Sequence, residues 1–166
     1  MSEDFIKQLG YKALDSRLKR ISDRMSHDIR KFYKELDLDV EPHWYLVFMI
    51  LQKKKTCSLS DIADCLGYAH PSVVVMIKKM SEKGYLQTQK DSNDKRKQLV
   101  TLTEKAFELL PKLELIWRCC DRAILAILDE NLSILSYVDA IDTKLEETSF
   151  HFRFRKEYLK LTTEKQ

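Results

Sequence analysis

Glycine and proline are scarce in this sequence, with three of each among 166 residues. Both residues interrupt helices, and both are frequent in turns and linkers. Their scarcity therefore favours a mostly helical chain without long flexible linkers. The length suits one domain with a sizeable core, or one protomer of an intertwined dimer. No internal repeat or low-complexity segment interrupts residues 1–166.

Long apolar runs and an apolar N-terminus are also missing. No run approaches the roughly 20 residues that a helix needs to cross a bilayer. The first residues, Met1-Ser2-Glu3-Asp4, are acidic and polar, unlike the start of a secretory signal. These features predict a cytoplasmic protein.

Patterns that would indicate a metal, a cofactor or a catalytic centre are absent as well. The four cysteines, Cys57, Cys65, Cys119 and Cys120, form no Cys-x-x-Cys pair, and the histidines show no zinc-ligand spacing. There is no Gly-rich phosphate loop and no signalled Ser/His/Asp arrangement. We therefore expect no metal and no cofactor, and an enzyme is the weakest of the functional hypotheses.

Two interpretations of the cysteines remain open. They can be free thiols in a reducing compartment that pack as small hydrophobic side chains. Alternatively, one of them can be a peroxide-sensing thiol, which requires nearby positive charge to lower its pKa. Cys65 is the candidate for the second interpretation because it lies in a predicted helix beside a basic segment.

The formal net charge of +3 is too small to indicate a nucleic-acid partner by itself, but the positive charges are unevenly distributed. Seven of them lie in the centre of the chain: Lys78, Lys79, Lys83, Lys90, Lys95, Arg96 and Lys97. Any one of these lysines can belong to an ordinary solvated face. The cluster as a whole favours an electrostatic partner such as DNA.

Residues 58–84 have the pattern of two short helices joined by a glycine turn. Ser58 and Asp61 predict a capping box, Gly67 supplies a left-handed turn residue, and Pro71 is tolerated in the first turn of the second helix. The first helix should bury Leu59, Ile62, Ala63 and Leu66. The second should bury Val73, Met76, Ile77 and Met80. This is the pattern of a helix-turn-helix, whose second helix can enter a DNA major groove.

A strand hairpin should follow the two helices. Gly84 ends the second helix, residues 86–89 alternate like a strand, and residues 98–102 form the returning strand. Between them, residues 91–94 have turn composition, and the tip carries Lys95, Arg96 and Lys97. A hairpin with a basic tip directly after a helix-turn-helix predicts a winged helix-turn-helix.

Long helices are predicted on both sides of this segment. Residues 4–35 read as one helix, in which Leu18, Ile21, Met25, Ile29 and Phe32 have near-heptad spacing. Its partner can lie in the same chain or in a second subunit. Pro42 opens a helix whose Trp44, Tyr45 and Phe48 are expected in the core.

After the hairpin, Thr103 should cap a helix to about residue 128 that is kinked at Pro111. Asp129 should start another helix. The tail from residue 149 alternates like a strand, but Phe150, Phe154 and Tyr158 also have helical spacing. We predict a helix there.

Residues 40–110 resemble the MarR (multiple antibiotic resistance regulator) family of bacterial winged-helix transcription factors. Four stretches carry the resemblance: Leu66-Gly67, Lys83-Gly84-Tyr85-Leu86, Asp94-Lys95-Arg96 and Val100-Thr101-Leu102-Thr103. Residues 41–44 (Glu-Pro-His-Trp) and 70–73 (His-Pro-Ser-Val) are most similar to a subgroup that often carries an acetyltransferase domain after the regulator. This chain is expected to be too short to include one.

The resemblance implies a mainly α fold, a single MarR-like domain over residues 1–166. The winged helix-turn-helix would span about 42–103, and dimerisation helices about 4–36 and 104–160. It also implies a homodimer that binds a palindromic operator as a sequence-specific transcriptional regulator. An effector pocket between the dimerisation helices and the DNA-binding lobe would hold a small molecule.

The DNA-binding residues follow from the predicted faces and from the resemblance. They are His70, Ser72, Val74, Val75, Lys78, Lys79, Asp94, Lys95, Arg96 and Lys97. In this hypothesis Asp94 does not touch DNA but aims Arg96 into a minor groove, while the lysines and Ser72 hold phosphates.

Val74 and Val75 depart from the family pattern, which usually places polar or basic residues at these positions. Apolar residues there can contact thymine methyl groups. They can also form a protein patch, so the alternative function is a winged-helix module for protein contacts or oligomerisation without specific DNA readout.

Overall fold

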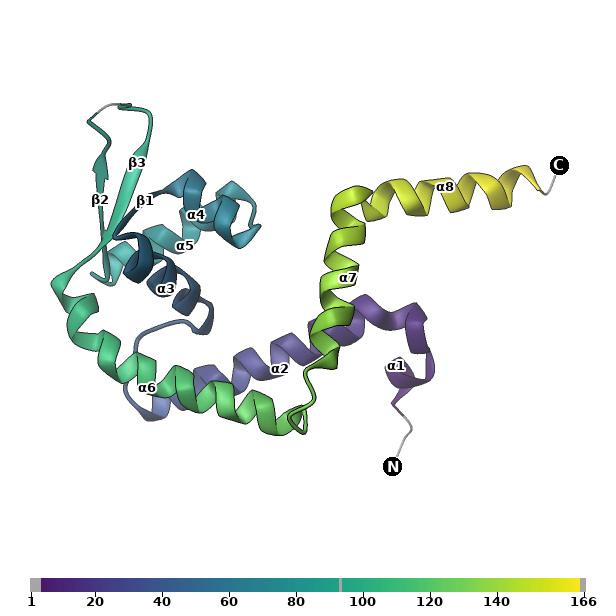
Figure 1. The fold of residues 1–166 in the computed structure, drawn as a ribbon, viewed down its shortest axis with the longest axis horizontal. Helices are drawn as coiled ribbons and strands as arrows, with labels where there is room; N and C mark the ends of the chain where they lie inside the picture. Colours follow the sequence, from purple (N-terminus) through teal and green to yellow (C-terminus); the bar gives the residue numbers. More distant parts are fainter. Residues whose placement is uncertain (1–3, 93, 165–166) are drawn as a thin grey trace. The chain divides into compact units, whose positions relative to one another are not determined.

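The computed structural model describes residues 4–92 and 94–164, and it has the expected mainly α architecture with a small antiparallel sheet (Figure 1). Residues 1–3, Asn93 and residues 165–166 lie outside the described residues. The polar N-terminus and part of the predicted hairpin turn therefore fall outside this description. The chain divides into two compact units, residues 1–110 and residues 111–166.

The N-terminal region is not one helix, so the prediction of a continuous helix over residues 4–35 is wrong. It consists of α1 (Phe5–Gln8), a 3-10 turn η1 (Gly10–Ala13) and α2 (Leu14–Glu35). Gly10 has a φ of +58°, a left-handed conformation that interrupts the helical hydrogen-bond ladder. Only the second part is a long helix.

The segment after α2 contains the aromatic core of the first unit. The 3-10 turn η2 (Pro42–Trp44) leads into α3 (Tyr45–Lys54). Trp44 and Phe48 are buried, as predicted. The expectation for Tyr45 is wrong because it lies on the outer side of α3 and is 39% exposed.

The two short helices are confirmed as α4 (Leu59–Leu66) and α5 (His70–Glu82). Ser58 and Asp61 form the reciprocal capping box, with N–H···O distances of 3.1 and 3.0 Å. Gly67 ends α4 at a φ of +63°. The whole predicted stripe of α5 is buried: Val73, Met76, Ile77 and Met80. On α4 only Ile62 and Ala63 are buried, and the outer leucines of the predicted face are half-buried.

The predicted hairpin is confirmed as β2 (Leu86–Lys90) and β3 (Gln98–Leu102), which pair in antiparallel register from Leu86 opposite Leu102 to Lys90 opposite Gln98. A third strand, β1 (Thr56–Ser58), pairs with the other edge of β3, so the sheet order is β1-β3-β2. Strand β1 was not predicted from the sequence because three residues are too few to show alternation. Figure 1 shows the hairpin projecting beyond α3, α4 and α5.

Helix α6 (Glu104–Ile127) begins where the sequence predicted. Thr103 caps it, since its Oγ1 accepts from the Ala106 amide at 3.3 Å. Pro111 lies inside the helix, at the boundary between the two compact units. The kink at Pro111 stays a prediction.

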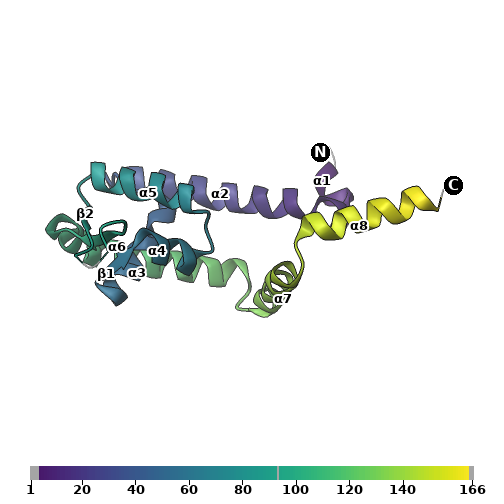
Figure 2. The ribbon, with the colours of Figure 1, turned by 90° about the horizontal axis from the view of Figure 1, so that it is seen from above.

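The second unit continues with α7 (Ser133–Glu147) and α8 (Phe150–Thr163). The predicted start of α7 at Asp129 is wrong, because Asp129 and Glu130 have φ values of 50° and 57°, which belong to a loop. Asn131 accepts from the Ser133 amide at 3.0 Å instead. The C-terminal segment is helical as predicted, and Figure 2 shows α8 as one continuous helix after the turn that ends α7.

Candidate nucleic-acid interface

Helix α5 presents an outer face opposite its buried stripe. Val74 and Val75 are 38% and 54% exposed, and Lys78 is exposed beside them. Burial of the stripe fixes this orientation, because positions 74, 75 and 78 fall on the other side of a helix with 3.6 residues per turn. The sequence therefore placed these side chains correctly, and the outer face is apolar at its centre.

The first turn of α5 carries two polar side chains, His70 and Ser72, both of which are exposed. Ala69 occupies the N-cap position of α5, and no side chain among the described residues caps the helix there. His70 is the first residue of the helix, and its side chain is exposed to solvent. Ser72 lies in the same turn, where helix amides favour an anionic partner.

The two lysines on α5 have different surroundings. Lys78 lies on the outer face, 3.8 Å from Glu82 in an i,i+4 pair. Lys79 lies on the flank of α5 that faces the preceding helices and lines a cavity there. Lys78 thus belongs to the same surface as Val75, whereas Lys79 lies at its edge.

The hairpin tip contains the predicted pair of Asp94 and Arg96. The Arg96 guanidinium makes two contacts with the Asp94 carboxylate, Nε to Oδ1 at 3.0 Å and Nη2 to Oδ2 at 3.3 Å. The Arg96 amide also donates to Oδ1 at 3.1 Å. These bonds lower the pKa of the Asp94 carboxyl, with the guanidinium as the main cause. The side chain of Arg96 is 92% exposed, so it is oriented by Asp94 while open to a partner.

The other two basic residues of the tip are exposed on the same turn. The Lys97 amide donates to the Asp94 carbonyl at 2.8 Å, and the Asp91 amide donates to the Lys97 carbonyl at 3.0 Å. These backbone bonds hold the tip closed. Lys95, Arg96 and Lys97 therefore lie on one turn, and among the described residues neither Lys95 nor Lys97 forms a salt bridge.

A cavity of about 470 Å³ lies between α2, the linker that follows it, and the C-terminal end of α5. Helix α2 supplies Arg30, Tyr33 and Lys34 to its wall. The other side is lined by Trp44 and by Lys79 and Lys83 of the α5 end, together with carboxylates of the linker and α5. The Nε1 of Trp44 is buried and has no hydrogen-bond partner among the described residues. The walls therefore combine aromatic surface with four cations, of which Arg30 and Lys83 are paired with Glu41 and Asp39.

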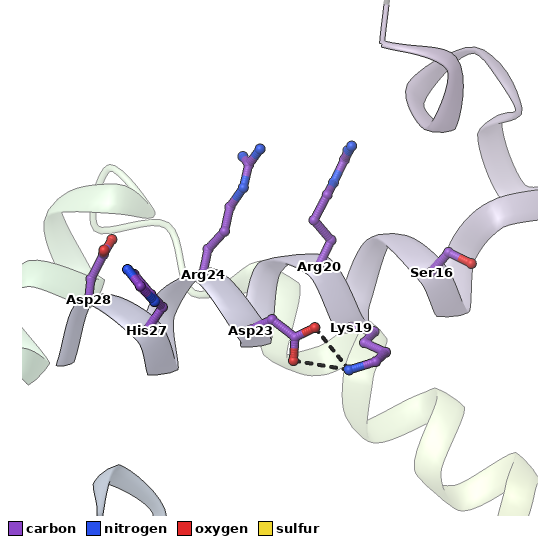
Figure 3. Close-up of a pocket in the computed structure, with 7 residues that line it drawn as sticks. All are labelled: Ser16, Lys19, Arg20, Asp23, Arg24, His27 and Asp28. Carbon is purple, nitrogen blue, oxygen red and sulfur yellow. Dashed lines mark hydrogen bonds and ion pairs between the residues drawn. The ribbon is translucent and has the colours of Figure 1, made fainter. Parts of the chain in front are cut away.

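A second hollow lies along one side of α2 (Figure 3). Arg20 and Arg24 point to the same side in this view, while Lys19 pairs with Asp23 at 2.9 Å. Arg20 is itself paired with Asp4 at 2.9 Å. The site is a solvated, mostly neutralised face of a single helix, so we assign no ligand to it.

The four cysteines are free thiols. Cys57 is buried, and burial raises the pKa of its thiol. Cys65 is exposed, and its sulfur lies 3.1 Å from the Lys54 Nζ. The described residues contain no cluster of His, Cys, Asp and Glu that could hold a metal ion. In the same part of the chain, no helix is long and apolar enough to cross a membrane.

One group beside the interface was missed in the sequence. Asp39 accepts a hydrogen bond from the Tyr85 hydroxyl, and Lys105 lies over the Tyr85 ring, 4.3 Å from its centroid. Asp39 and Tyr85 are 46 positions apart. Periodicity and local motifs describe neighbours in sequence, so no signal of that kind could have joined these residues.

The fold that carries the candidate interface is similar to that of known proteins. Residues 38–97 match the MarR family. The transcriptional repressor CouR, bound to a 23-mer DNA duplex, is 22% identical with a TM-score of 0.66, and the match covers 81% of this chain and 96% of CouR.

Two further solved structures are similar. A mutant of MarR from E. coli complexed with operator DNA is 14% identical with a TM-score of 0.65, over 86% of this chain and 99% of that chain. The PcaV transcriptional regulator from Streptomyces coelicolor, in complex with its natural ligand, is 13% identical with a TM-score of 0.64, over 90% and 99%. Identities this low show a shared fold. The chain is therefore similar to the MarR family over residues 38–97 and shares the fold of these solved structures.

Proposed function

We propose that the protein is a sequence-specific DNA-binding transcriptional regulator that binds a palindromic operator as a homodimer. The observation that carries this proposal is the hairpin tip, where Asp94 orients an almost fully exposed Arg96 between two further cations. In a two-fold dimer, two α5 helices would enter successive major grooves about one duplex turn, roughly 34 Å, apart.

Exposed apolar side chains support the homodimer. On α2, Leu14, Leu18, Ile21 and Phe32 are all exposed. Neither α7 nor α8 has a buried residue, although both carry large apolar side chains such as Tyr137 and Phe154. Patches of this extent mark interaction sites. A second copy of the chain presents the same faces and would cover them.

The proposal gives each surface residue a role. Arg96 would enter a minor groove, where narrow A·T-rich segments attract arginine. Val74 and Val75 would contact thymine methyl groups, with His70 as a polar reader nearby. The phosphate contacts would come from Ser72, Lys78, Lys79, Lys95 and Lys97.

A finer assignment within the family is also part of the proposal. The stretches that start at Glu41 and His70 favour the subgroup that often carries an acetyltransferase domain. We place the protein in the cytoplasm and assign it no catalytic activity, because its candidate residues are suited to contacts with DNA.

The cavity beside α5 supports a small-molecule effector. Its aromatic wall and its cations suit a small aromatic acid, and a ligand there would contact α2 and α5 together. Titration with benzoate should quench the fluorescence of Trp44 and change the affinity for DNA. Trp44→Phe, with Trp117 as the remaining tryptophan, should lose the quenching. Unchanged fluorescence and unchanged DNA affinity over a series of aromatic acids would contradict this site.

A second candidate function is a winged-helix module that contacts another protein. The specific observation that favours it is the exposure of Val74 and Val75 at the centre of the outer face. A mobility shift on DNA from the protein's own promoter separates the two candidates. We expect binding that weakens steeply as salt rises, because counterions are released from each neutralised phosphate. Binding that is absent at low salt would favour the protein-contact module.

A further inference from the structure

Tyr85 lies just past the end of α5 and is buried to 2% exposure. Its ring packs edge-on against Phe48 and Trp44, with centroid separations of 5.8 and 6.3 Å. Its hydroxyl donates to the carboxylate of Asp39, in the linker between α2 and η2. The turn that follows α5 is thus attached, through Tyr85, to the linker that follows α2.

The turn formed by residues 83–85 also contacts the start of α6. Lys105 Nζ lies over the Tyr85 ring and donates to the Lys83 carbonyl at 2.7 Å. The Thr103 hydroxyl donates to the Gly84 carbonyl at 2.6 Å, and the Thr103 amide donates to the Tyr85 carbonyl at 3.1 Å. Every residue from 83 to 85 is therefore bonded to the first turn of α6 or the residue before it.

The linker is in turn fixed to α2. The Leu38 amide donates to the Tyr33 carbonyl at 2.9 Å, and Arg30 pairs with Glu41 at 3.0 Å. Asp39 lies between these two contacts and also pairs with Lys83 at 3.4 Å. The hydrogen bond from Tyr85 is the main cause of the lowered pKa of the Asp39 carboxyl, so Asp39 is ionised at neutral pH.

We propose that Asp39 and Tyr85 are positioning residues for DNA recognition: together they form a joint that sets the angle of α5 against α2 and the first turn of α6. This inference rests on the proposed function. In the dimer, that angle would determine the distance between the two DNA-reading ends of α5, and therefore the half-site spacing that the protein prefers.

Because the joint lies at one end of α5, a small rotation there displaces the DNA-reading end of the helix by a large distance. The 13 residues of α5 span about 20 Å at 1.5 Å per residue. The joint lies at the C-terminal end, whereas His70 and Ser72 lie at the other end. A rotation of about 10° at the joint would move the first turn of α5 by about 3 Å, close to one base-pair step of about 3.4 Å. Neither Asp39 nor Tyr85 belongs to the outer face of α5, so the joint acts only through the helix.

The test compares Tyr85→Phe and Asp39→Asn with the wild type on a set of DNA duplexes. Tyr85→Phe removes the hydroxyl and keeps the ring. Tyr11→Phe, at the most exposed tyrosine, and Asp37→Asn, in the same linker, are matched controls. Dissociation constants are measured for the preferred symmetric operator, for operators with the half-sites one base pair closer or farther apart, and for an isolated half-site.

We expect both variants to bind the isolated half-site as the wild type does. Their preference for the wild-type spacing should fall by about two- to thirtyfold, the range expected for mutations that alter coupling between sites. The double variant should match the stronger single variant, because both act through one bond. The two controls should keep the wild-type spacing preference.

A wild-type spacing preference in both variants would overturn the inference, even if their melting temperatures fall, because the joint would then be purely structural. If either variant does not fold, Lys105→Met tests the joint from the α6 side with the same two outcomes. If the wild-type protein binds no symmetric operator, the proposed function is refuted, and so is the role of the joint in DNA recognition.

Discussion

The winged module, residues 42–103, and the two C-terminal helices differ in how they use their apolar side chains. The module buries Trp44, Phe48 and Val73 in a continuous core. Helices α7 and α8 bury none of their residues and stack Phe150 on Phe154 in the open, with ring centroids 6.4 Å apart. Their internal order comes from local bonds, such as that from Arg153 Nη2 to the Lys144 carbonyl at 2.6 Å.

This difference separates a part of the chain that has its own core from a part whose apolar side chains lie exposed. The module has its own core, a capping box and a paired sheet. Short helices without packing are marginal in water, so packing of α7 and α8 against another apolar surface would stabilise them. DNA contact and dimerisation should therefore respond to different substitutions.

A matched pair of phenylalanine substitutions should give the largest effects, one on the free energy of unfolding and the other on the dimer dissociation constant. Phe48→Ala removes a fully buried side chain and should cost about 3–5 kcal/mol of unfolding free energy. Phe154→Ala, on the exposed face of α8, should instead raise the dimer dissociation constant. Urea unfolding and sedimentation at micromolar concentration measure the two effects. A well-folded wild-type monomer at micromolar concentration would contradict the comparison.

The next largest effect is a loss of DNA affinity on substitution in the hairpin tip. Arg96→Ala should weaken DNA binding by about 1.5–3 kcal/mol, the worth of hydrogen bonds to charged groups, and reduce the preference for narrow A·T-rich minor grooves. Lys95→Ala should weaken binding equally across sequences and flatten the salt slope by about 1. Titrations on two operators over a range of salt measure both. Normal binding by both variants would show that the tip does not contact DNA.

A smaller effect tests the apolar centre of the α5 outer face. Replacing thymine with uracil at the matching operator position should weaken binding by about 1 kcal/mol, the usual cost of one altered base pair. Val75→Ala should reduce that difference and leave the fold intact, because Val75 is exposed. If uracil has no effect at any operator position, methyl readout is excluded and the protein-contact interpretation gains support.

The smallest effect is the pH dependence of the joint at Asp39. The pKa of this carboxyl is lowered first by the Tyr85 hydroxyl and further by Lys105 and Lys83. The ionised carboxylate therefore stabilises the fold above its unfolded pKa of about 3.9, and this contribution is lost as pH falls through the folded pKa. Asp39 is half-exposed, so screening should limit the effect to about 1 kcal/mol or less.

Urea unfolding of the wild type and Asp39→Asn at pH 7 and pH 3 measures this contribution. The wild type should be the more stable at pH 7, and the difference should shrink at pH 3. Asp37→Asn removes the same charge from the same linker and serves as the reference. A difference that grows toward low pH would have the wrong sign for a lowered pKa.

Local signals in the sequence predicted most of the winged module. The capping box at Ser58, the glycine turn and the α5 stripe depend on residues within a few positions of one another. The pair of Asp94 and Arg96 is local as well. These features agree because propensity, pattern and turn chemistry indicate the same structure there.

Features that depend on distant contacts or on single backbone conformations were not predicted. The left-handed Gly10 divides the N-terminal helix although the apolar stripe continues across it. The left-handed Asp129 delays the start of α7, and β1 exists only because β3 pairs with it. Tyr85 finds Asp39 through the tertiary fold. Periodicity carries no information about such contacts.

Selection of bound sequences from random DNA tests the central claim most directly. The protein is incubated with a random duplex library at moderate salt, and the retained sequences are amplified and aligned over several rounds. Our account predicts a consensus with two-fold symmetry, with half-sites centred about 10–10.5 base pairs apart and A·T-rich flanks where Arg96 enters. A library that shows no enrichment, or a consensus without two-fold symmetry, would contradict it.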